Sequence, residues 1–277
     1  MKNFFVNLLC SLIPSKKLSY SVRSRLENSG DLARCSKKTL HRLGYRVQKM
    51  ANGITITGHG LNIFGGADNT LWTAAGVLSG EYDFDSHGKD FVAIDIGLNI
   101  GLASLYLARK DFIKKIYSFE PFKPIFDQAK NNLKLNPQIS NKIEIFNFGL
   151  SDHDGEIEVA FNPDLPGQMS TIIDRFADKG YGKETATLKR ASKILTPIFA
   201  RHGKNIMLKI DCEGGEREII PDLAKFELLG HVSVIIMEWH NGIVQPLEDL
   251  VKKHGFNVRI YNENKEAKTG MLYGERQ

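Results

Sequence analysis

Asp95-Ile-Gly97-Leu-Asn99-Ile-Gly101 is the stretch of sequence that decides the fold. It directly follows the apolar run Phe91–Ile94 and leads into Leu102–Ala108, whose apolar spacing predicts a helix. The order of strand, glycine turn and helix is typical of α/β folds that bind nucleotides. Glycines in such a turn let the backbone approach a ligand closely. The start of the helix offers N–H groups to an anion such as a carboxylate.

An acidic residue, Glu120, ends the next apolar strand and lies 25 residues after Asp95. Nucleotide-binding α/β folds place a carboxylate there to bind ribose hydroxyls. A dinucleotide fingerprint reads G-x-G-x-x-G, but this turn begins with an aspartate, whose charge would repel a pyrophosphate. An acid suits a ligand that carries an ammonium group, such as the methionine part of S-adenosylmethionine (SAM). We therefore expect Asp95, Gly97, Asn99 and Gly101 to hold the methionine end of SAM, and Glu120 its ribose.

The composition is ordinary for a soluble globular protein. The 277 residues are 42% hydrophobic and 25% charged, with a formal net charge of +5. The basic excess lies near the N-terminus, at Lys16, Lys17, Arg23, Arg25, Arg34, Lys37, Lys38, Arg42, Arg46 and Lys49. Aromatic and basic residues do not alternate there as in RNA-binding modules, so nucleic acid is not an expected partner. Three scattered cysteines show no disulfide framework or metal-binding spacing, which favours a cytoplasmic protein.

Three segments are expected along the chain. Residues 1–50 are predicted to form a basic helical extension, residues 51–84 a β-hairpin followed by a helix, and residues 85–277 the SAM-binding catalytic domain. The first 13 residues are too short an apolar segment to span a bilayer, and no clear cleavage site follows them. With two lysines after it, this segment is interpreted either as an amphipathic helix on the inner face of the membrane or as a helix packed on the domain.

Alternating strands and helices predict a mostly parallel, doubly wound α/β sheet of the Rossmann-like kind. Strands are expected near residues 91–96, 114–119, 143–148, 205–212 and 232–238, and an antiparallel hairpin near residues 256–261 and 269–273 closes the chain. Asp154-Gly155 is expected to turn into an inserted hairpin over residues 156–160. The polar stretch of residues 162–184 is expected to form a loop over the acceptor site.

A second constellation lies after the fourth and fifth predicted strands. Such sheets bind ligands beyond the carboxyl ends of their strands, which here carry Asp211, Glu213 and Glu216, then Glu238 and His240. One interpretation is a Mg²⁺ or Mn²⁺ site of Asp211, Glu238 and His240. Another is acid–base catalysis by His240 or Asp211, with Glu213 as a further catalytic candidate. The third is structural, with acids capping helices, and it is favoured for Glu216.

Five segments taken together resemble the FkbM family of SAM-dependent methyltransferases. They are Asp95-Ile-Gly-Leu-Asn-Ile-Gly101, Phe119-Glu-Pro121, Leu150-Ser-Asp152 with Gly155, Leu208-Lys-Ile-Asp-Cys-Glu-Gly-Gly-Glu216 and Glu238-Trp-His240. The resemblance covers about residues 80 to 260 and implies a class I methyltransferase sheet and methyl transfer to oxygen. Acceptors in this family are commonly sugar hydroxyls of polysaccharides, glycolipids or natural products.

The resemblance also bears on individual positions. With SAM across the first three strands, Ser151 and Asp152 are expected to approach its adenine. The family usually has alanine where Leu98 and Gly215 stand. Neither difference removes a polar group, so the chain is expected to be active.

The sequence alone leaves other functions open. The chain could be a non-catalytic SAM-binding or scaffold protein, or a methyltransferase for a small molecule that is not a sugar. A NAD-linked dehydrogenase would need the third glycine of its fingerprint, which is missing here. Methyltransferases that act on amino groups of nucleic acids carry an Asn/Asp-Pro-Pro-aromatic motif, and the sequence contains none.

Overall fold

A computed structural model describes residues 29–66, 69–161, 181–242, 244–261 and 268–276. The apolar segment 1–13, on which the membrane interpretation depends, lies outside these residues, as does most of the expected 162–184 loop. Within the described part, no helix is both long enough and apolar enough to cross a membrane.

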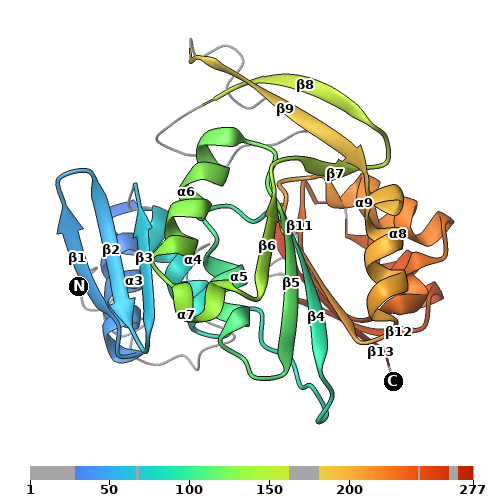
Figure 1. Cartoon of the computed structure of the whole chain (residues 1–277), viewed down its shortest axis with the longest axis horizontal. Coiled ribbons are helices and arrows are strands. Elements are labelled where there is room, and N and C mark those ends of the chain that lie inside the picture. Colours follow the sequence, from blue (N-terminus) through green and yellow to red (C-terminus); the bar gives the residue numbers. More distant parts are fainter. Residues whose placement is uncertain (1–28, 67–68, 162–180, 243, 262–267, 277) are drawn as a thin grey trace.

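The central sheet has seven strands in the order β12-β13-β11-β10-β4-β5-β6 (Figure 1). Their bounds are β4 Phe91–Ile96, β5 Ile113–Phe119, β6 Ile143–Phe146, β10 Ile206–Ile210, β11 Val232–His240, β12 Phe256–Tyr261 and β13 Thr269–Arg276. The pairs β4–β5, β5–β6, β4–β10 and β10–β11 are parallel, while β13 runs antiparallel to both β11 and β12. The predicted parallel sheet with an antiparallel terminal hairpin is therefore confirmed.

Helices cover both faces of this sheet. One group is α4 Asn69–Leu78, α5 Leu102–Ala108, α6 Lys123–Lys134 and α7 Pro137–Ser140, and the other is α8 Ala191–His202, α9 Glu216–Lys225 and α10 Gln245–Lys253 (Figure 1). Neighbouring residues of β4 pack into different cores, with Ala93 facing α4 and α5 and Ile94 facing α8 and α9. Because both faces are buried, the central strands are continuous apolar runs.

The N-terminal unit is a helix with a three-stranded antiparallel sheet. It comprises α3 Ser29–Arg42, β1 Arg46–Met50, β2 Gly53–Gly58 and β3 Leu61–Gly65. The expected helix up to residue 50 is wrong at its end, because residues 46–50 pair with β2 as a third strand. The expected boundary at residue 50 thus falls inside one sheet. Cys35 takes part in a disulfide bond, which the cysteine pattern did not predict, whereas Cys212 is free.

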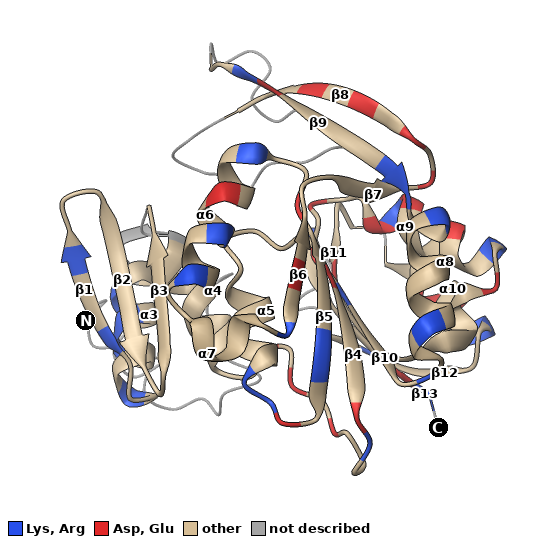
Figure 2. Ribbon diagram, viewed as in Figure 1, with Lys and Arg blue, Asp and Glu red and all other residues tan. Residues whose placement is uncertain are grey.

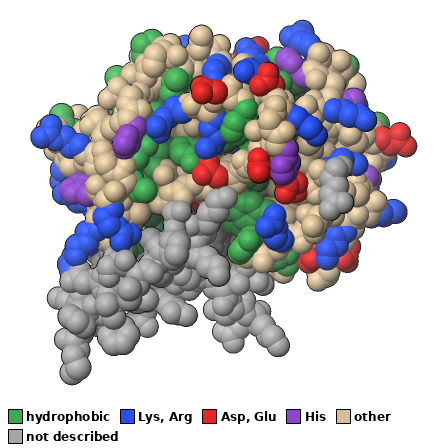
Figure 3. All heavy atoms as spheres, turned by 90° about the horizontal axis from the view of Figure 1, so that it is seen from below, with side chains coloured by type: hydrophobic (Ala, Val, Ile, Leu, Met, Phe, Trp, Pro, Cys, Tyr) green, Lys and Arg blue, Asp and Glu red, His purple; other side chains and the backbone are tan. Residues whose placement is uncertain are grey.

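This unit has a basic surface. Residues 32–66 contain six lysines and arginines and no acidic residue, and these basic residues are exposed in the structure. Figure 2 shows blue on β1 and no red on β1, β2 or β3. Figure 3 shows blue and purple side chains without red ones along its left edge, where Figure 1 places this unit. The charge asymmetry expected from the sequence is therefore present on the surface.

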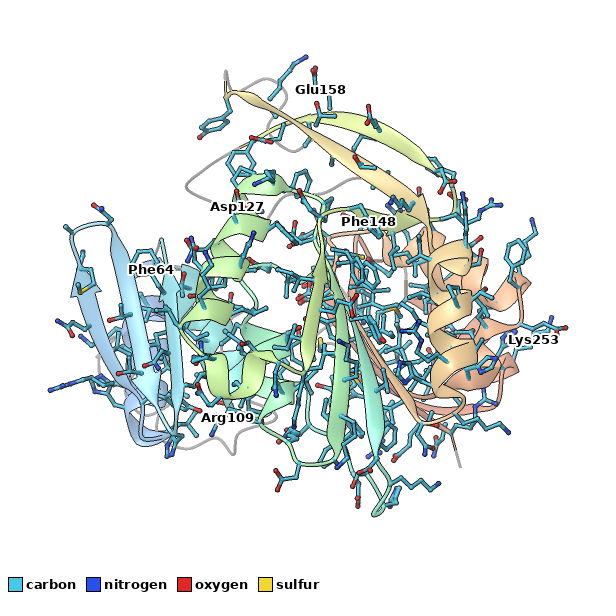
Figure 4. All side chains as sticks on the ribbon, viewed as in Figure 1. Phe64, Arg109, Asp127, Phe148, Glu158 and Lys253 are labelled. Atoms are coloured by element: carbon cyan, nitrogen blue, oxygen red, sulfur yellow. The ribbon has the colours of Figure 1, made fainter. Side chains whose placement is uncertain are left out.

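Two buried asparagines of the α6 region join the N-terminal unit to the central domain. Asn132 accepts the backbone N–H of Phe64 at 2.9 Å and donates to the carbonyls of Phe64 and Ile100, both at 2.9 Å. Asn136 accepts the N–H of Asn62 at 2.8 Å and donates to its carbonyl at 2.6 Å. Phe64 is labelled on β3 beside α6 in Figure 4. The two amides therefore pair with the edge of β3 as a neighbouring strand would.

We expect Asn132→Ala to lower the free energy of unfolding by about 2–4 kcal/mol, because it leaves the buried N–H of Phe64 and the carbonyl of Ile100 without this partner. Urea denaturation followed by circular dichroism measures the change. The matched control is Asn131→Ala on the exposed side of the same helix, which should change stability by less than about 0.5 kcal/mol. Equal losses in the two variants would show that the amide contacts do not hold the units together.

A third, small sheet lies over the carboxyl edge of the central sheet (Figure 1). It consists of β7 Gly149–Ser151, β9 Lys183–Arg190 and β8 Gly155–Ala160, in that order. The expected hairpin over residues 156–160 is wrong in its partner, because β8 pairs with β9 and not with the strand before it. Asp154 accepts the backbone N–H of Arg190 at 2.9 Å and so ties the turn to β9. The partner strand β9 begins more than 20 residues after β8, and a local turn motif cannot predict pairing over that distance.

Candidate active site

The glycine turn connects β4 to α5 at the carboxyl edge of the sheet. Gly97 and Gly101 have φ angles of 85° and 86°, and Asn99 has a φ of 50°. A Cβ on Gly97 would lie 1.8 Å from the carbonyl oxygen of Asp211. A side chain at residue 97 would therefore force apart the ends of β4 and β10, which carry the two predicted constellations.

Backbone N–H groups of the turn donate within the protein. Those of residues 97 and 98 donate to the carbonyl of Phe119, at 3.1 and 2.9 Å. The N–H of Asn99 donates to the Glu120 carboxylate at 2.9 Å, and the next N–H donates to the side chain of Asn99 at 2.8 Å. The expected role of the turn in binding a ligand thus depends on its shape and not on these N–H groups.

Glu120 lies where the sequence places it, directly after β5 and against the turn. Its side chain is buried, and its two oxygens accept the N–H groups of Asn99 and Phe122 at 2.9 and 3.1 Å. Burial raises the pKa of Glu120 to about 7, although the two N–H donors act in the opposite direction. Each carboxylate oxygen retains a second lone pair that can accept a hydroxyl.

Asp95 is completely buried, and its charge is balanced inside the protein. Ser104 donates its hydroxyl to one carboxylate oxygen at 2.5 Å, and the ammonium of Lys209 lies 2.8 Å from the other. Lys209 also donates to the carbonyls of Ile96 and Gly97, at 3.3 and 2.5 Å. Asp95 therefore fixes the turn through Lys209, which donates to the Gly97 carbonyl. Because Asp95 is completely buried, it has no exposed oxygen that could contact a ligand directly.

Lys209 is buried but charged. Burial acts to lower its pKa, while the carboxylates of Asp95 and Asp211 raise it, and the net shift is upward. The parallel register of β4 and β10 places Lys209 directly opposite Asp95. The pair therefore follows from the order of the strands in the sheet.

The acidic constellation comes together around His240. The His240 Nε2 atom is 3.7 Å from a Glu213 oxygen and 4.0 Å from a Glu238 oxygen. One ligand atom each from Asp211, Glu238 and His240 lie within 4.8 Å of one another. The structure thus brings together the residues that the sequence suggested for catalysis or for a metal ion.

Glu216 holds His240 from the opposite side. It is completely buried, and its carboxylate accepts the backbone N–H groups of His240 and Gly214 at 2.8 and 3.0 Å. It also lies 3.3 Å from His240 Nδ1. This structural role agrees with the interpretation favoured for Glu216, but its partner His240 was not expected.

His240 carries a proton at neutral pH. Burial acts to lower its pKa, but Glu216, Glu238 and Glu213 raise it to about 9. Both ring nitrogens face carboxylates, which is the environment of an imidazolium. In the free protein His240 is thus better suited to hold the acids in place than to accept a proton.

Tyr82 was missed by sequence reasoning. It precedes the central sheet, is buried, and donates its hydroxyl to Asp211 Oδ2 at 3.2 Å. No local pattern marks it, because its partner is 129 residues away along the chain.

Ser151 and Asp152 lie at the end of β7, in the small sheet. Ser151 is buried and donates its hydroxyl to Glu218 of α9 at 2.6 Å. Asp152 is exposed and lies 2.7 Å from His153 Nδ1, whose hydrogen bond lowers the Asp152 pKa. In the structure, then, the Ser151 hydroxyl is engaged by the protein and the Asp152 side chain faces solvent. The predicted approach of these residues to adenine stays a prediction.

The fold and the placement of these groups define a class of enzyme. Five parallel strands, a glycine turn after the central one and an antiparallel strand near one edge form the class I fold of SAM-dependent methyltransferases. The family model described as the methyltransferase FkbM domain matches residues 95–258, more than half of the chain. The chain therefore belongs to the FkbM methyltransferase family, as the sequence motifs indicated.

Individual proteins are also similar to this chain. Methyltransferase sdnD of Sordaria araneosa is 31% identical over 205 residues, covering 64% of this chain and 78% of that protein. The AMB antimetabolite synthetase AmbE of Pseudomonas aeruginosa is 27% identical over 212 residues, covering 62% of this chain but only 10% of that protein. The crystal structure of a methyltransferase FkbM from Methylobacillus flagellatus is a distant likeness, with a TM-score of 0.43 and 10% identity. It covers 89% of this chain and 60% of that one.

Proposed function

We propose that this methyltransferase uses SAM to methylate a hydroxyl oxygen, and that the acceptor is a sugar of a polysaccharide, a glycolipid or a related metabolite. The observation that carries the proposal is the position of Asp211, Glu213 and Glu238 at the strand ends beside the glycine turn. Carboxylates accept hydrogen bonds from hydroxyls, and sugars offer several hydroxyls to such a cluster.

The residues around the turn fit the cofactor. Glu120 is a buried carboxylate beside the turn, with lone pairs for the ribose hydroxyls. Gly97 and Gly101 keep the turn free of side chains, and Lys209 with Asp95 fixes its backbone. Bound SAM supplies an electrophilic methyl group on a cationic sulfur. The acids nearby are compatible with that positive charge.

Residues of the acidic cluster bind the acceptor and remove its proton. As the acceptor oxygen gains its bond to the methyl carbon, it must lose its proton, and Asp211 is placed to take it. His240 was the other candidate for this role, but it already holds a proton in the free protein. Glu213 and Glu238 hold neighbouring hydroxyls, and alignment of the acceptor oxygen contributes a large share of the rate.

The direct test is incubation of the pure protein with methyl-labelled SAM and a cell-envelope carbohydrate extract. We expect label in a base-stable ether linkage on a sugar. Label in a fraction free of carbohydrate would indicate a different small-molecule acceptor. SAM binding by calorimetry without transfer to any extract would instead identify a non-catalytic SAM-binding protein.

We expect SAM affinity to fall about tenfold between pH 8 and pH 6, because Glu120 has a pKa of about 7 and must be ionised to accept ribose hydroxyls. Isothermal titration calorimetry at several pH values measures this dependence. Glu120→Gln should bind SAM more weakly and with little pH dependence. Glu144→Gln, at an exposed glutamate of β6, is the control and should behave as the parent protein. A flat affinity of the parent from pH 6 to 8 would exclude this role for Glu120.

The Mg²⁺ or Mn²⁺ site is a further part of the proposal. Two carboxylates and a histidine with donor atoms within 4.8 Å of one another match the ligands of a hard divalent cation, which would have to displace the proton of His240 on binding. We expect turnover to fall after dialysis against a chelator and to recover on addition of Mg²⁺ or Mn²⁺. Unchanged turnover in the chelated protein would remove the metal ion from the mechanism and leave the proton transfer to Asp211.

A further inference from the structure

Tyr82 lies outside the part of the chain that matches the FkbM family model, yet it reaches the candidate active site. The match begins at residue 95, whereas Tyr82 belongs to the segment between α4 and β4. Its side chain is only 3% exposed, and its hydroxyl donates to Asp211 Oδ2 at 3.2 Å. The segment before the matched region therefore contributes a hydrogen bond to Asp211, which follows β10.

The segment that carries Tyr82 is fixed on both sides. Gly80 takes a left-handed conformation with φ 94°, which turns the chain after α4. The Glu81 carbonyl accepts the hydroxyl of Tyr273 on β13 at 2.8 Å. Asp83 accepts the hydroxyl of Tyr106 on α5 at 2.7 Å. The residues on either side of Tyr82 are thus hydrogen-bonded to two different elements of the central domain, β13 and α5.

The hydrogen bond between Tyr82 and Asp211 can have only one donor. The Tyr82 phenol is the donor in this contact, and the Asp211 carboxylate is the acceptor. The hydrogen bond occupies a lone pair of one Asp211 oxygen and fixes the rotation of the carboxylate. The ring also lies 5.7 Å from the ammonium of Lys209, a residue of β10.

We propose that Tyr82 is a positioning residue, which orients the Asp211 carboxylate toward the acceptor hydroxyl. This inference rests on the proposed function, in which Asp211 receives the hydroxyl proton. Tyr82 itself takes no proton and contacts Asp211 through its hydroxyl. The N-terminal segment then completes the active site, and a core cut at residue 95 would lack this part of it.

Tyr82→Phe tests the inference, because it removes the hydroxyl and keeps the ring. The assay uses methyl-labelled SAM and the cell-envelope carbohydrate extract. We expect the rate at saturating extract to fall roughly tenfold, as for the loss of one hydrogen bond to a charged group. SAM affinity and the extract concentration at half-maximal rate should stay within about twofold. Tyr45→Phe is the control, because it removes another buried tyrosine hydroxyl, which accepts from Arg109 at 2.7 Å away from the site, and it should leave the rate unchanged.

A double-mutant cycle separates positioning from a general structural effect. In the Asp211→Asn background, Tyr82→Phe should cause no further loss, because the group that it orients is already inactive. The same fractional loss in both backgrounds, or a normal rate for Tyr82→Phe alone, would overturn the inference. Thermal unfolding of each variant detects a folding defect, and Tyr82→Met serves as the second variant if Tyr82→Phe does not fold.

The two proposals fail in different ways. If Asp211→Asn alone retains the full rate, the assignment of Asp211 in the proposed function is wrong. If Asp211→Asn is slow and Tyr82→Phe is as fast as the parent protein, only the role of Tyr82 is wrong.

Discussion

Asp211→Asn is expected to lower the rate of methyl transfer by roughly 10²–10⁴-fold, the usual contribution of a positioned proton acceptor. Asparagine has nearly the same shape and can still accept the Tyr82 hydroxyl through its amide oxygen, but it cannot take up a proton. SAM affinity should stay close to that of the parent protein, because the turn packs against the backbone carbonyl of residue 211, which the substitution keeps.

The measurement compares initial rates with labelled SAM and affinities from calorimetry. Asp249→Asn is the matched control, because Asp249 is an exposed carboxylate on α10, away from the strand ends. It should show the rate of the parent protein. A fast Asp211→Asn variant would mean that the proton leaves by another route, and the His240 and metal-ion interpretations would then be tested next.

Lys209→Met is expected to lower the free energy of unfolding by about 3–5 kcal/mol, because it leaves the buried charge of Asp95 without its partner. Asp95 is completely buried and Lys209 is 2% exposed, so solvent cannot replace the lost charge. The carbonyls of Ile96 and Gly97 also lose their donor. Denaturant unfolding monitored by circular dichroism measures the change.

A second variant separates lost charge balance from lost packing. Asp95→Asn combined with Lys209→Met removes both charges, so it should recover part of the stability lost in Lys209→Met alone. Lys204→Met, at an exposed lysine before β10, is the control and should change stability by less than about 0.5 kcal/mol. If the double variant were less stable than the single one, the buried ion pair would not be the cause of the loss.

Sequence reasoning located the glycine turn between β4 and α5 because its signals are local. The apolar run, the positive-φ glycines and the helix lie within about 20 residues, and Glu120 follows at the end of the next strand. The same reasoning missed α8, over residues 191–202. It also gave β8 the wrong partner, because the turn at Asp154 is ordinary in sequence whereas β9 lies far along the chain.

The amino-acid sequence by itself determined the alternation of strands and helices, the class of fold and the acids at the strand ends. It did so because these properties depend on residue type and on spacing over a few turns or strands. Tertiary structure alone decided which groups meet. The β4–β10 register pairs Lys209 with Asp95, and folding brings Tyr82 to Asp211 and Glu216 to His240. These contacts join residues distant in sequence. Burial then raises the pKa of Glu120, whereas the carboxylates gathered around His240 raise the pKa of that histidine.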